Sequence, residues 1–243
     1  MALKGRVALV TGAAVRIGRA ITLALAGAGC HVFIHYGRSH TAAQQTQAEA
    51  EALGVETAIH PADLTDAAAV QGVVEAAVQR FGRVDILINN AALFLPGDLA
   101  TTTLDDWQAQ FKVNLRAPFL LCQAFARQIP PDGFGQIINV TDARVFRPAG
   151  DHLAYRLTKA ALLTLTESLA RDLAPRITVN AVALGAILPP PGEDETFLQN
   201  LAETRIPLRR PGSLAAVTAN VLHLLEQEFL TGVVVRVDGG EYL

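Results

Sequence analysis

The sequence contains few of the residues from which disulfide scaffolds and metal sites are built. Only two cysteines, Cys30 and Cys122, occur in 243 residues. One lies at the start of a predicted strand and the other in an apolar helical stretch, so we expect two buried thiols in a reducing, cytoplasmic compartment. The six histidines show no metal-ligand spacing such as His-Glu-x-x-His, and we therefore predict no catalytic metal.

Charge and long apolar runs are also scarce. Charged residues make up 18% of the chain and the formal net charge is −3, which gives no reason to expect binding to nucleic acid or to a membrane surface. No uncharged run is long enough to span a bilayer, and the first residues lack the long apolar stretch of a signal peptide. We expect a small-molecule substrate rather than a nucleic-acid or membrane partner.

Hydrophobic residues, in contrast, form half of the chain, whose length suits one large domain spanning residues 1–243. Strand-like runs at 7–11, 31–35, 57–60, 86–89, 136–140, 178–182 and 233–237 alternate with helical patterns at 17–27, 42–53, 67–81, 104–128, 153–173 and 213–226. The strand runs are almost continuously apolar, as in strands covered on both faces of a parallel sheet.

This alternation predicts an α/β protein, a single-domain doubly wound Rossmann fold in which a seven-stranded parallel sheet carries helices on both faces. We expect a cofactor half at about 1–100 and a catalytic half at about 101–243. The irregular stretch 185–211 contains Pro189-Pro190-Pro191-Gly192. It is either a surface loop or, as its length and its position after a strand favour, a substrate lid.

A glycine-rich turn follows the first predicted strand. Thr11-Gly12 opens the turn, and Gly18 lies on the next helix, where the missing side chain allows close helix–strand packing. This context predicts a dinucleotide site with the pyrophosphate on the helix N-terminus, the alternative being a glycine turn without a ligand. Arg16 replaces the middle glycine, and we expect its guanidinium to reach across the phosphates or into the substrate cavity.

The choice of cofactor follows from a missing acid. An NAD site needs an Asp or Glu roughly twenty residues past the glycines to hold the ribose 2′-hydroxyl, and this chain has no acidic residue before Glu49. Arg38 can instead bind a 2′-phosphate through paired N–H donors, with Ser39 donating one more bond. We therefore predict NADPH. Asp63, after the third strand, is expected either to accept a bond from the adenine amino group or to cap the next helix.

Tyr155 and Lys159 lie four residues apart, and hence on the same face of a predicted helix. A phenol, with a pKa of about 10, is a poor proton donor or base at neutral pH. We expect a neighbouring ammonium, together with an oxidised nicotinamide, to favour its ionised form. Asn114 is a polar residue in an otherwise apolar helix, and we expect it either to hold a water beside Lys159 or to kink the helix.

Over essentially its whole length the chain resembles the short-chain dehydrogenase/reductase family. The shared segments, in order, are the 11–18 turn, Asn89-Asn90-Ala91, Asn114, Tyr155-x-x-x-Lys159, 180–185 and 237–240. The resemblance implies that Tyr155 is the proton donor, that Lys159 binds the nicotinamide ribose and assists Tyr155, and that Asn114 supports a proton relay. It also implies cofactor contacts from Gly12, Ile17, Gly18, Tyr36, Leu64, Asn90, Ala91, Gly185 and Ile187.

The family usually has a serine thirteen residues before the tyrosine, where this chain has Asp142. The sequence is similar to pteridine reductases at this position, at the 11–18 turn, at His35-Tyr36-x-Arg38-Ser39 and at Phe94 after Asn89-Asn90-Ala91. The similarity implies that Asp142 pairs with Tyr155, that Phe94 stacks the pterin against nicotinamide, and that Arg16 reaches phosphate and substrate. Thr141 is not expected to replace the serine, because successive side chains of a strand point to opposite faces.

The chemistry of Asp142 favours the same substrate class. Ketone reduction builds negative charge on oxygen, which a hydroxyl would stabilise and a carboxylate would repel. Reduction of a C=N bond needs a proton at nitrogen, which a carboxyl–phenol pair can deliver. We predict hydride transfer to a pterin of the dihydrobiopterin, dihydromonapterin or dihydrofolate kind. The alternatives are an NADPH-dependent carbonyl reductase of a 3-oxoacyl thioester, sugar or quinone, a non-catalytic NADPH sensor and, for Asp142 itself, a cap or turn residue.

The chain departs from the family at Leu184 and Ile187, and the apolar helix 153–173 bears on its assembly. Leu184 stands where the family usually has proline before Gly185, so the backbone that contacts the carboxamide is expected to differ. Ile187 removes a hydroxyl that many pteridine reductases carry. The predicted helix 153–173 is apolar on most of its circumference, so we predict that the face turned away from the sheet packs against a partner chain. The resemblance implies a homotetramer.

Overall fold

A seven-stranded sheet forms the centre of the molecule, whose computed structural model describes residues 2–147, 149–190 and 192–243. The strands are β1 (Val7–Val10), β2 (His31–Tyr36), β3 (Thr57–Pro61), β4 (Ile86–Asn89), β5 (Gly135–Asp142), β6 (Ile177–Leu184) and β7 (Val234–Val237). They pair in parallel in the order β3-β2-β1-β4-β5-β6-β7. The strand order reverses between β1 and β4, so the predicted doubly wound α/β fold is confirmed, and its ligand crevice is expected at the carboxyl ends of these two strands.

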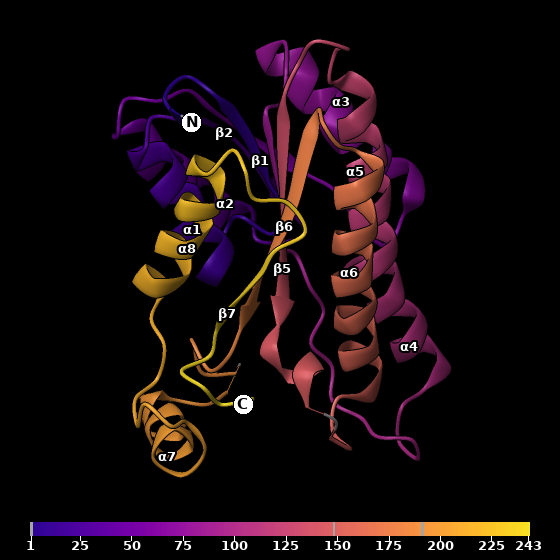
Figure 1. Ribbon diagram of the computed structural model, residues 1–243, viewed down its shortest axis with the longest axis vertical. Coiled ribbons are helices and arrows are strands. Elements are labelled where there is room, and N and C mark those ends of the chain that lie inside the picture. The colour runs from indigo at the N-terminus through magenta and orange to yellow at the C-terminus, as the bar shows by residue number, and fades with distance from the viewer. Residues whose placement is uncertain (1, 148, 191) are drawn as a thin grey trace.

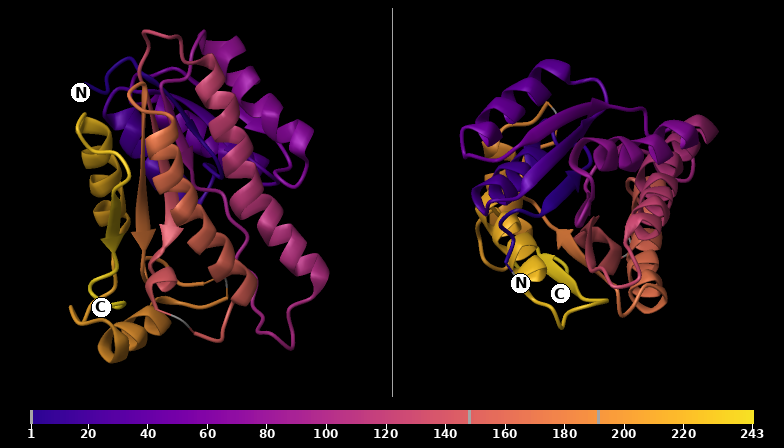
Figure 2. Two further views of the ribbon diagram at one scale, coloured as in Figure 1. Left: turned by 45° about the vertical axis from the view of Figure 1, so that its right-hand side comes forward. Right: turned by 90° about the horizontal axis from the view of Figure 1, so that it is seen from above.

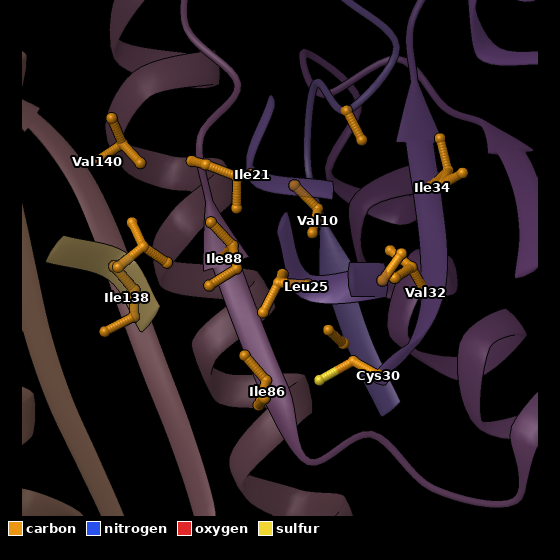
Figure 3. Close-up of a cluster of buried hydrophobic side chains, with 14 of the residues drawn as sticks. Val10, Ile21, Leu25, Cys30, Val32, Ile34, Ile86, Ile88, Ile138 and Val140 are labelled. Carbon is orange, nitrogen blue, oxygen red and sulfur yellow. The ribbon is translucent and has the colours of Figure 1, made fainter. Parts of the chain in front are cut away.

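Helices cover both faces of the sheet (Figures 1 and 2). One layer holds α1 (Arg16–Gly27), α2 (His40–Glu51) and α8 (Leu214–Glu226), and the other holds α3 (Ala67–Phe81), α5 (Ala117–Gln128) and α6 (Leu153–Asp172). Neighbouring strand residues alternate between the layers: Ile86 and Ile88 pack toward α1, whereas Leu87 packs toward α3 and α5. Figure 3 shows the hydrophobic cluster on the α1 side of the sheet, which includes Ile86 and Ile88. The strands read as unbroken apolar runs because both of their faces are buried.

The predicted helix 104–128 is wrong in its middle. The chain forms α4 (Leu104–Phe111), a π-helical turn η1 (Lys112–Arg116) and then α5. Asn114 lies within η1 and is completely buried, with its side-chain amide bonded outside its own helix. π-helical turns of this kind interrupt the regular bonding ladder and occur often at functional sites.

The segment predicted to be irregular contains a helix, α7 (Glu195–Arg205). Asp194 caps it by accepting hydrogen bonds from the backbone N–H groups of Thr196 and Phe197. A short polar helix after a proline run has a weak apolar pattern, so its cap is its clearest sequence signal. Residue 191 of the predicted 185–211 lid lies outside the described residues.

Both cysteines are buried free thiols, as predicted. Burial raises the pKa of Cys30 to about 11 and that of Cys122 to about 12, so both remain protonated and unreactive at neutral pH. Among the described residues, no helix combines the length and the apolar character that crossing a membrane would take.

Candidate active site

The candidate site lies at the carboxyl edge of the sheet, where the predicted polar segments converge. In Figure 1 the arrow of β5 points toward the lower edge of the view, where α7 and the C-terminus also lie. The turn after β1, the segment after β4 and the end of β5 meet here, since β1, β4 and β5 are neighbours in the sheet.

The 11–18 turn requires glycine at two positions for steric reasons. Gly12 has a φ of 62°, and a Cβ there would lie 3.0 Å from Ala91 Cα. A Cβ on Gly18 would lie 2.1 Å from the Gly12 carbonyl oxygen and 2.6 Å from Asn90 Nδ2. Asn90 fixes the turn by donating to the carbonyl oxygens of Thr11 and Gly12. The start of α1 can therefore press against the turn only because these side chains are missing.

The N-terminal end of α1 is open to a ligand. Its N-cap residue is Val15, no side chain accepts a hydrogen bond there, and the first turn holds no acidic residue. Uncapped helix amides of this kind attract anions. Arg16 adopts a φ of 54°, a left-handed conformation that usually belongs to glycine. Its guanidinium donates to the carbonyl oxygen of Pro189 at 2.7 Å, which ties the glycine turn to the 185–211 segment.

His35 is a residue of the site to which the sequence assigned no role. Its Nδ1 accepts the Gly12 N–H at 3.2 Å, and its Nε2 lies 3.1 Å from the Ala62 carbonyl oxygen. Burial lowers the pKa of His35 to about 4, so the ring is neutral near pH 7 and Nε2 carries the proton that Ala62 accepts. In the sequence His35 appears only as part of the His35-Tyr36-x-Arg38-Ser39 segment that is similar to pteridine reductases, with no role of its own.

The end of β2 presents the residues predicted to choose the cofactor. Arg38 and Ser39 are exposed, and Ser39 precedes α2 without making a side-chain cap bond. Tyr36 is buried, and its hydroxyl lies 2.5 Å from His40 Nδ1. No acidic side chain is among the residues of this strand end, because none occurs before Glu49.

Asp63 does not cap α3, so that alternative is wrong. The cap is Asp66, which accepts the Ala68 N–H, whereas Asp63 accepts the N–H of Thr65 at 2.8 Å. This bond and the charge of Arg38 lower the pKa of the exposed Asp63 carboxyl. Leu64 is buried against the α3 and α5 layer.

Tyr155 and Lys159 lie together as their spacing predicts, and Asp142 joins them as the resemblance to pteridine reductases implies. The Tyr155 hydroxyl donates to Asp142 Oδ2 at 3.0 Å. Lys159 Nζ donates to the carbonyl oxygen of Val140 at 2.8 Å and lies 5.7 Å from the centre of the Tyr155 ring. β5 continues to Asp142, and the Thr141 hydroxyl donates to the Lys159 carbonyl oxygen instead of entering the site. The alternation along the strand explains why Thr141 does not replace the missing serine.

The electrostatics of the free protein differ from the lysine effect that the sequence suggested. Burial, together with the charge of Asp142 and the hydrogen bond to it, raises the pKa of Tyr155 well above that of a free phenol. Burial also lowers the pKa of Lys159 to about 8, opposed by the attraction of Asp142. Without a cofactor, Tyr155 therefore keeps its proton at neutral pH, as a proton donor must.

The side chain of Asn114 holds two elements together. Its Oδ1 accepts the Leu93 N–H, and its Nδ2 donates to the Leu93 carbonyl oxygen and to Thr158 Oγ1. Both amide hydrogens of Asn114 therefore bond within the protein, and one of their acceptors, Thr158, directly precedes Lys159 in the chain. Asn114 lies in the π-helical turn, which interrupts the regular helix at the residue where a kink was one of the two expectations.

Phe94 lies at the opening of the site, with 37% of its surface exposed. Its ring stacks on His152 with centres 4.2 Å apart, and meets the Tyr155 ring edge-on at 4.7 Å. The Arg144 guanidinium lies 5.5 Å from the centre of the Phe94 ring. His152, held with a φ of 49° before α6, is a second site residue that the sequence did not reveal.

Gly185 and Ile187 shape the far side of the site in different ways. A Cβ on Gly185 would lie 2.7 Å from Asp238 Cα, so glycine allows the ends of β6 and β7 to approach. Ile187 is buried in the hydrophobic cluster under α8, as is Leu184. The side chain of Ile187 therefore belongs to the core, and only its backbone is left to make the predicted cofactor contact.

The known proteins that are similar to this chain include reductases named for acyl-carrier-protein substrates and reductases named for dihydrofolate. A family model described as "Enoyl-(Acyl carrier protein) reductase" matches residues 12–241. A 3-oxoacyl-[acyl-carrier-protein] reductase from Synechocystis sp. is 35% identical, with 98% of each chain covered.

Solved structures are similar over the whole chain. The FolM alternative dihydrofolate reductase 1 of Brucella canis, complexed with NADP, is 33% identical with a TM-score of 0.92, covering 100% of this chain and 96% of that one. A short chain dehydrogenase from Burkholderia cenocepacia, in complex with NADP, is 36% identical with a TM-score of 0.92 and covers 100% of both chains.

Proposed function

The chain belongs to the short-chain dehydrogenase/reductase family, and from this we propose that it is an NADPH-dependent reductase of a pterin-type C=N bond. The relatives that are reductases and the similar structures solved with NADP support an NADP-dependent oxidoreductase. The pterin substrate depends on one observation above all, the hydrogen bond of 3.0 Å from Tyr155 to Asp142.

The residues present fit NADPH. The glycines allow the Gly12–Gly18 turn to pack tightly against Asn90 and Ala91, and the uncapped end of α1 offers its amides to a pyrophosphate. Arg38 and Ser39 are exposed where a 2′-phosphate would lie, and Asp63 beyond them would accept the adenine amino group. Further contacts are proposed from Ile17, Tyr36, Leu64, Asn90, Ala91, Lys159 and the backbone at Gly185 and Ile187. When bound, the cofactor supplies a hydride.

The chain's own residues manage the proton. Reduction of C=N adds hydride to carbon and a proton to nitrogen, and the Tyr155 hydroxyl is proposed to supply that proton. The Lys159 ammonium offsets the negative charge left on the phenol. The Asp142 carboxylate orients the hydroxyl and accepts bonds from ring N–H groups of the substrate. Asn114 donates a hydrogen bond to Thr158 and so positions the part of α6 that carries Tyr155 and Lys159. It is also proposed to support the resupply of protons.

Phe94 and Arg16 are proposed to hold the substrate ring. Phe94 is exposed at the opening of the site and contacts the Tyr155 ring, so a flat heterocycle can stack beside it. Arg16 reaches the 185–211 segment at Pro189. Through this bond the segment is proposed to close over the ring as a lid.

A carbonyl reductase of 3-oxoacyl thioesters is the second candidate, favoured by the similarity to the 35% identical 3-oxoacyl-[acyl-carrier-protein] reductase of Synechocystis sp.. Against it stands the anionic Asp142 beside the position where a ketone oxygen would become negative. NADPH oxidation with dihydrobiopterin and dihydrofolate, compared with an acetoacetyl thioester, decides between them. We expect turnover of the pterins; turnover of the thioester alone would overturn the proposal. Tight NADPH binding without turnover of any substrate would indicate a sensor.

The enzyme is further proposed to lie in the cytoplasm, because its two cysteines are free thiols. It is also proposed to form a homotetramer. In the single chain, the outer face of α6 is left largely uncovered, with Leu157 42% exposed. A groove of about 680 Å³ runs beside it, lined by Trp107, Phe111, Leu115, Phe119, Ala161 and Leu165. The predicted apolar face thus has no cover within the described residues, and a second copy is the proposed cover.

A further inference from the structure

A second pocket opens next to the proposed ring site. It has a volume of about 480 Å³ and lies where three segments meet: the connection from β5 to α6, the end of α7 and the residues after β7. The charged side chains that line it are Arg144, Arg147, Arg156, Arg205, Asp151 and Glu241. The volume suits part of a small molecule.

Positive charge exceeds negative charge in this pocket, with four arginines against two acidic residues. Asp151 is shared, at 2.9 Å from Arg144 and 3.5 Å from Arg156. Arg205, 52% exposed, pairs with the buried Glu241 at 3.1 Å. Arg147 is exposed and forms no ion pair with any part of the chain that the structure describes. An anion entering the pocket would therefore meet an uncompensated guanidinium.

The side chains of Arg144, Arg156 and Arg205 are held in place before any ligand binds, and so is the backbone of Arg147. Arg156 donates hydrogen bonds to the carbonyl oxygens of Arg144 and Arg147, which fixes the segment that carries them. Arg205 comes from the last turn of α7, so the lid segment contributes to the pocket wall. A preformed arrangement loses less conformational freedom on binding.

Arg144 connects the pocket to the catalytic centre. Its backbone N–H donates to Asp142 Oδ1 at 2.8 Å, and its guanidinium lies 5.5 Å from the Phe94 ring centre. Phe94 in turn contacts Tyr155. A substrate whose ring lies at Phe94 and whose chain passes Arg144 would place the end of that chain in the pocket.

We propose that this pocket binds a carboxylate-bearing tail of the substrate, so that the enzyme prefers a pterin of the dihydrofolate kind to one with a short neutral side chain. Guanidinium groups match carboxylates through paired N–H donors. The proposal rests on the proposed function, since the ring must be a pterin for the tail to be that of a folate.

The test compares kcat/KM for dihydrofolate and dihydrobiopterin in the wild type and in Arg147→Gln and Arg147→Glu. For dihydrofolate we expect a loss of about tenfold in Arg147→Gln, mainly through KM, because one charge-assisted bond is removed. The loss should be larger in Arg147→Glu, while dihydrobiopterin changes less than about twofold. Arg80→Gln is the matched control, since Arg80 pairs with Glu56 on a distant surface. Equal effects on the two substrates, or none, would overturn the proposal.

A binding measurement separates this proposal from the proposed function. Calorimetric titration of p-aminobenzoyl-glutamate into the NADP-loaded wild type should give saturable binding that Arg147→Glu abolishes. If that binding is seen but no pterin is reduced, the proposed reaction fails and the anion pocket stands. If dihydrofolate is reduced equally well by Arg147→Glu, the pocket proposal fails and the reaction stands.

Discussion

The Tyr155 hydroxyl and the Asp142 carboxylate share a hydrogen bond of 3.0 Å, with Tyr155 as the donor. Both groups lie beside the buried Lys159, whose charge Asp142 helps to retain. This arrangement places an acceptor where most members of the family have a hydroxyl donor. The substrate range of the enzyme should therefore depend on residue 142.

Asp142→Ser restores the usual family residue and should exchange one activity for another. Pterin reduction is expected to fall by about a hundredfold or more, the usual contribution of a positioned acid–base group. Reduction of an acetoacetyl thioester should rise, since a hydroxyl can stabilise an oxyanion. Steady-state NADPH oxidation measures both, with Asp132→Ser as a control because Asp132 is exposed. Unchanged pterin turnover in Asp142→Ser would contradict the role given to the carboxylate.

The dependence of kcat/KM on pH should reflect the loss of the proton from Lys159. Because the pKa of Lys159 is about 8 instead of 10.5, its ammonium loses charge as the pH rises through 8, and kcat/KM should fall there. Tyr155, with its raised pKa, keeps its proton over that range. Asp142→Asn removes the charge that raises the Lys159 pKa, so the alkaline limb should move to lower pH. A limb that stays in place would exclude Lys159 as its source.

The fold and the shared helix face of Tyr155 and Lys159 could be predicted from the sequence pattern, whereas the pairing of Tyr155 with Asp142 was implied by the resemblance to pteridine reductases. Strands buried on two faces are unbroken apolar runs, and a residue spacing of four on a helix fixes a shared face. The π-helical turn at Asn114 could not, because it depends on bonds to Leu93 and Thr158, which are distant in the chain. Propensity within one helix carries no information on such bonds.

The roles of His35 and His152 and the raised pKa of Tyr155 could not be predicted, for a related reason. His35 and His152 act through contacts with Gly12 and Phe94 that form only in the folded chain. The raised pKa of Tyr155 likewise depends on burial, whereas the motif alone suggested the opposing effect of Lys159. Ile187 was expected at the cofactor, but its side chain fills the core under α8.

Gly18→Ala should disrupt cofactor binding. Its Cβ would lie 2.1 Å from the Gly12 carbonyl oxygen, a backbone atom that cannot move without opening the turn. We expect the Kd for NADPH, measured by fluorescence titration, to rise about tenfold or more. Gly27→Ala lies on the same helix with nothing within 4 Å. It should leave the Kd unchanged, because its Cβ meets no other atom. Similar NADPH affinities for the two variants would disprove the steric argument.

His35 should make the protein sensitive to acid. Its pKa is about 4 in the folded protein and 6.5 in the reference state. Between these values the unfolded chain binds more protons, so the free energy of unfolding should decrease as the pH falls from 6.5 to 4, by up to about 3 kcal/mol. Urea unfolding at several pH values should show a shallower slope for His35→Gln. A residual slope is expected from His60, whose pKa burial also lowers. An unchanged slope would mean that His35 is not the titrating group.

Leu165→Glu should break the assembly without unfolding the chain. Leu165 lines the apolar groove between α4 and α6, and a charge buried against a second copy would be left without a partner. Sedimentation at micromolar concentration should show a tetramer for the wild type and smaller species for the variant, with similar circular dichroism. Leu53→Glu makes the same change at a leucine that is 52% exposed outside the groove, and it should remain tetrameric. A wild type that sediments only as a monomer would remove the proposal, because the outer face of α6 would then need no cover.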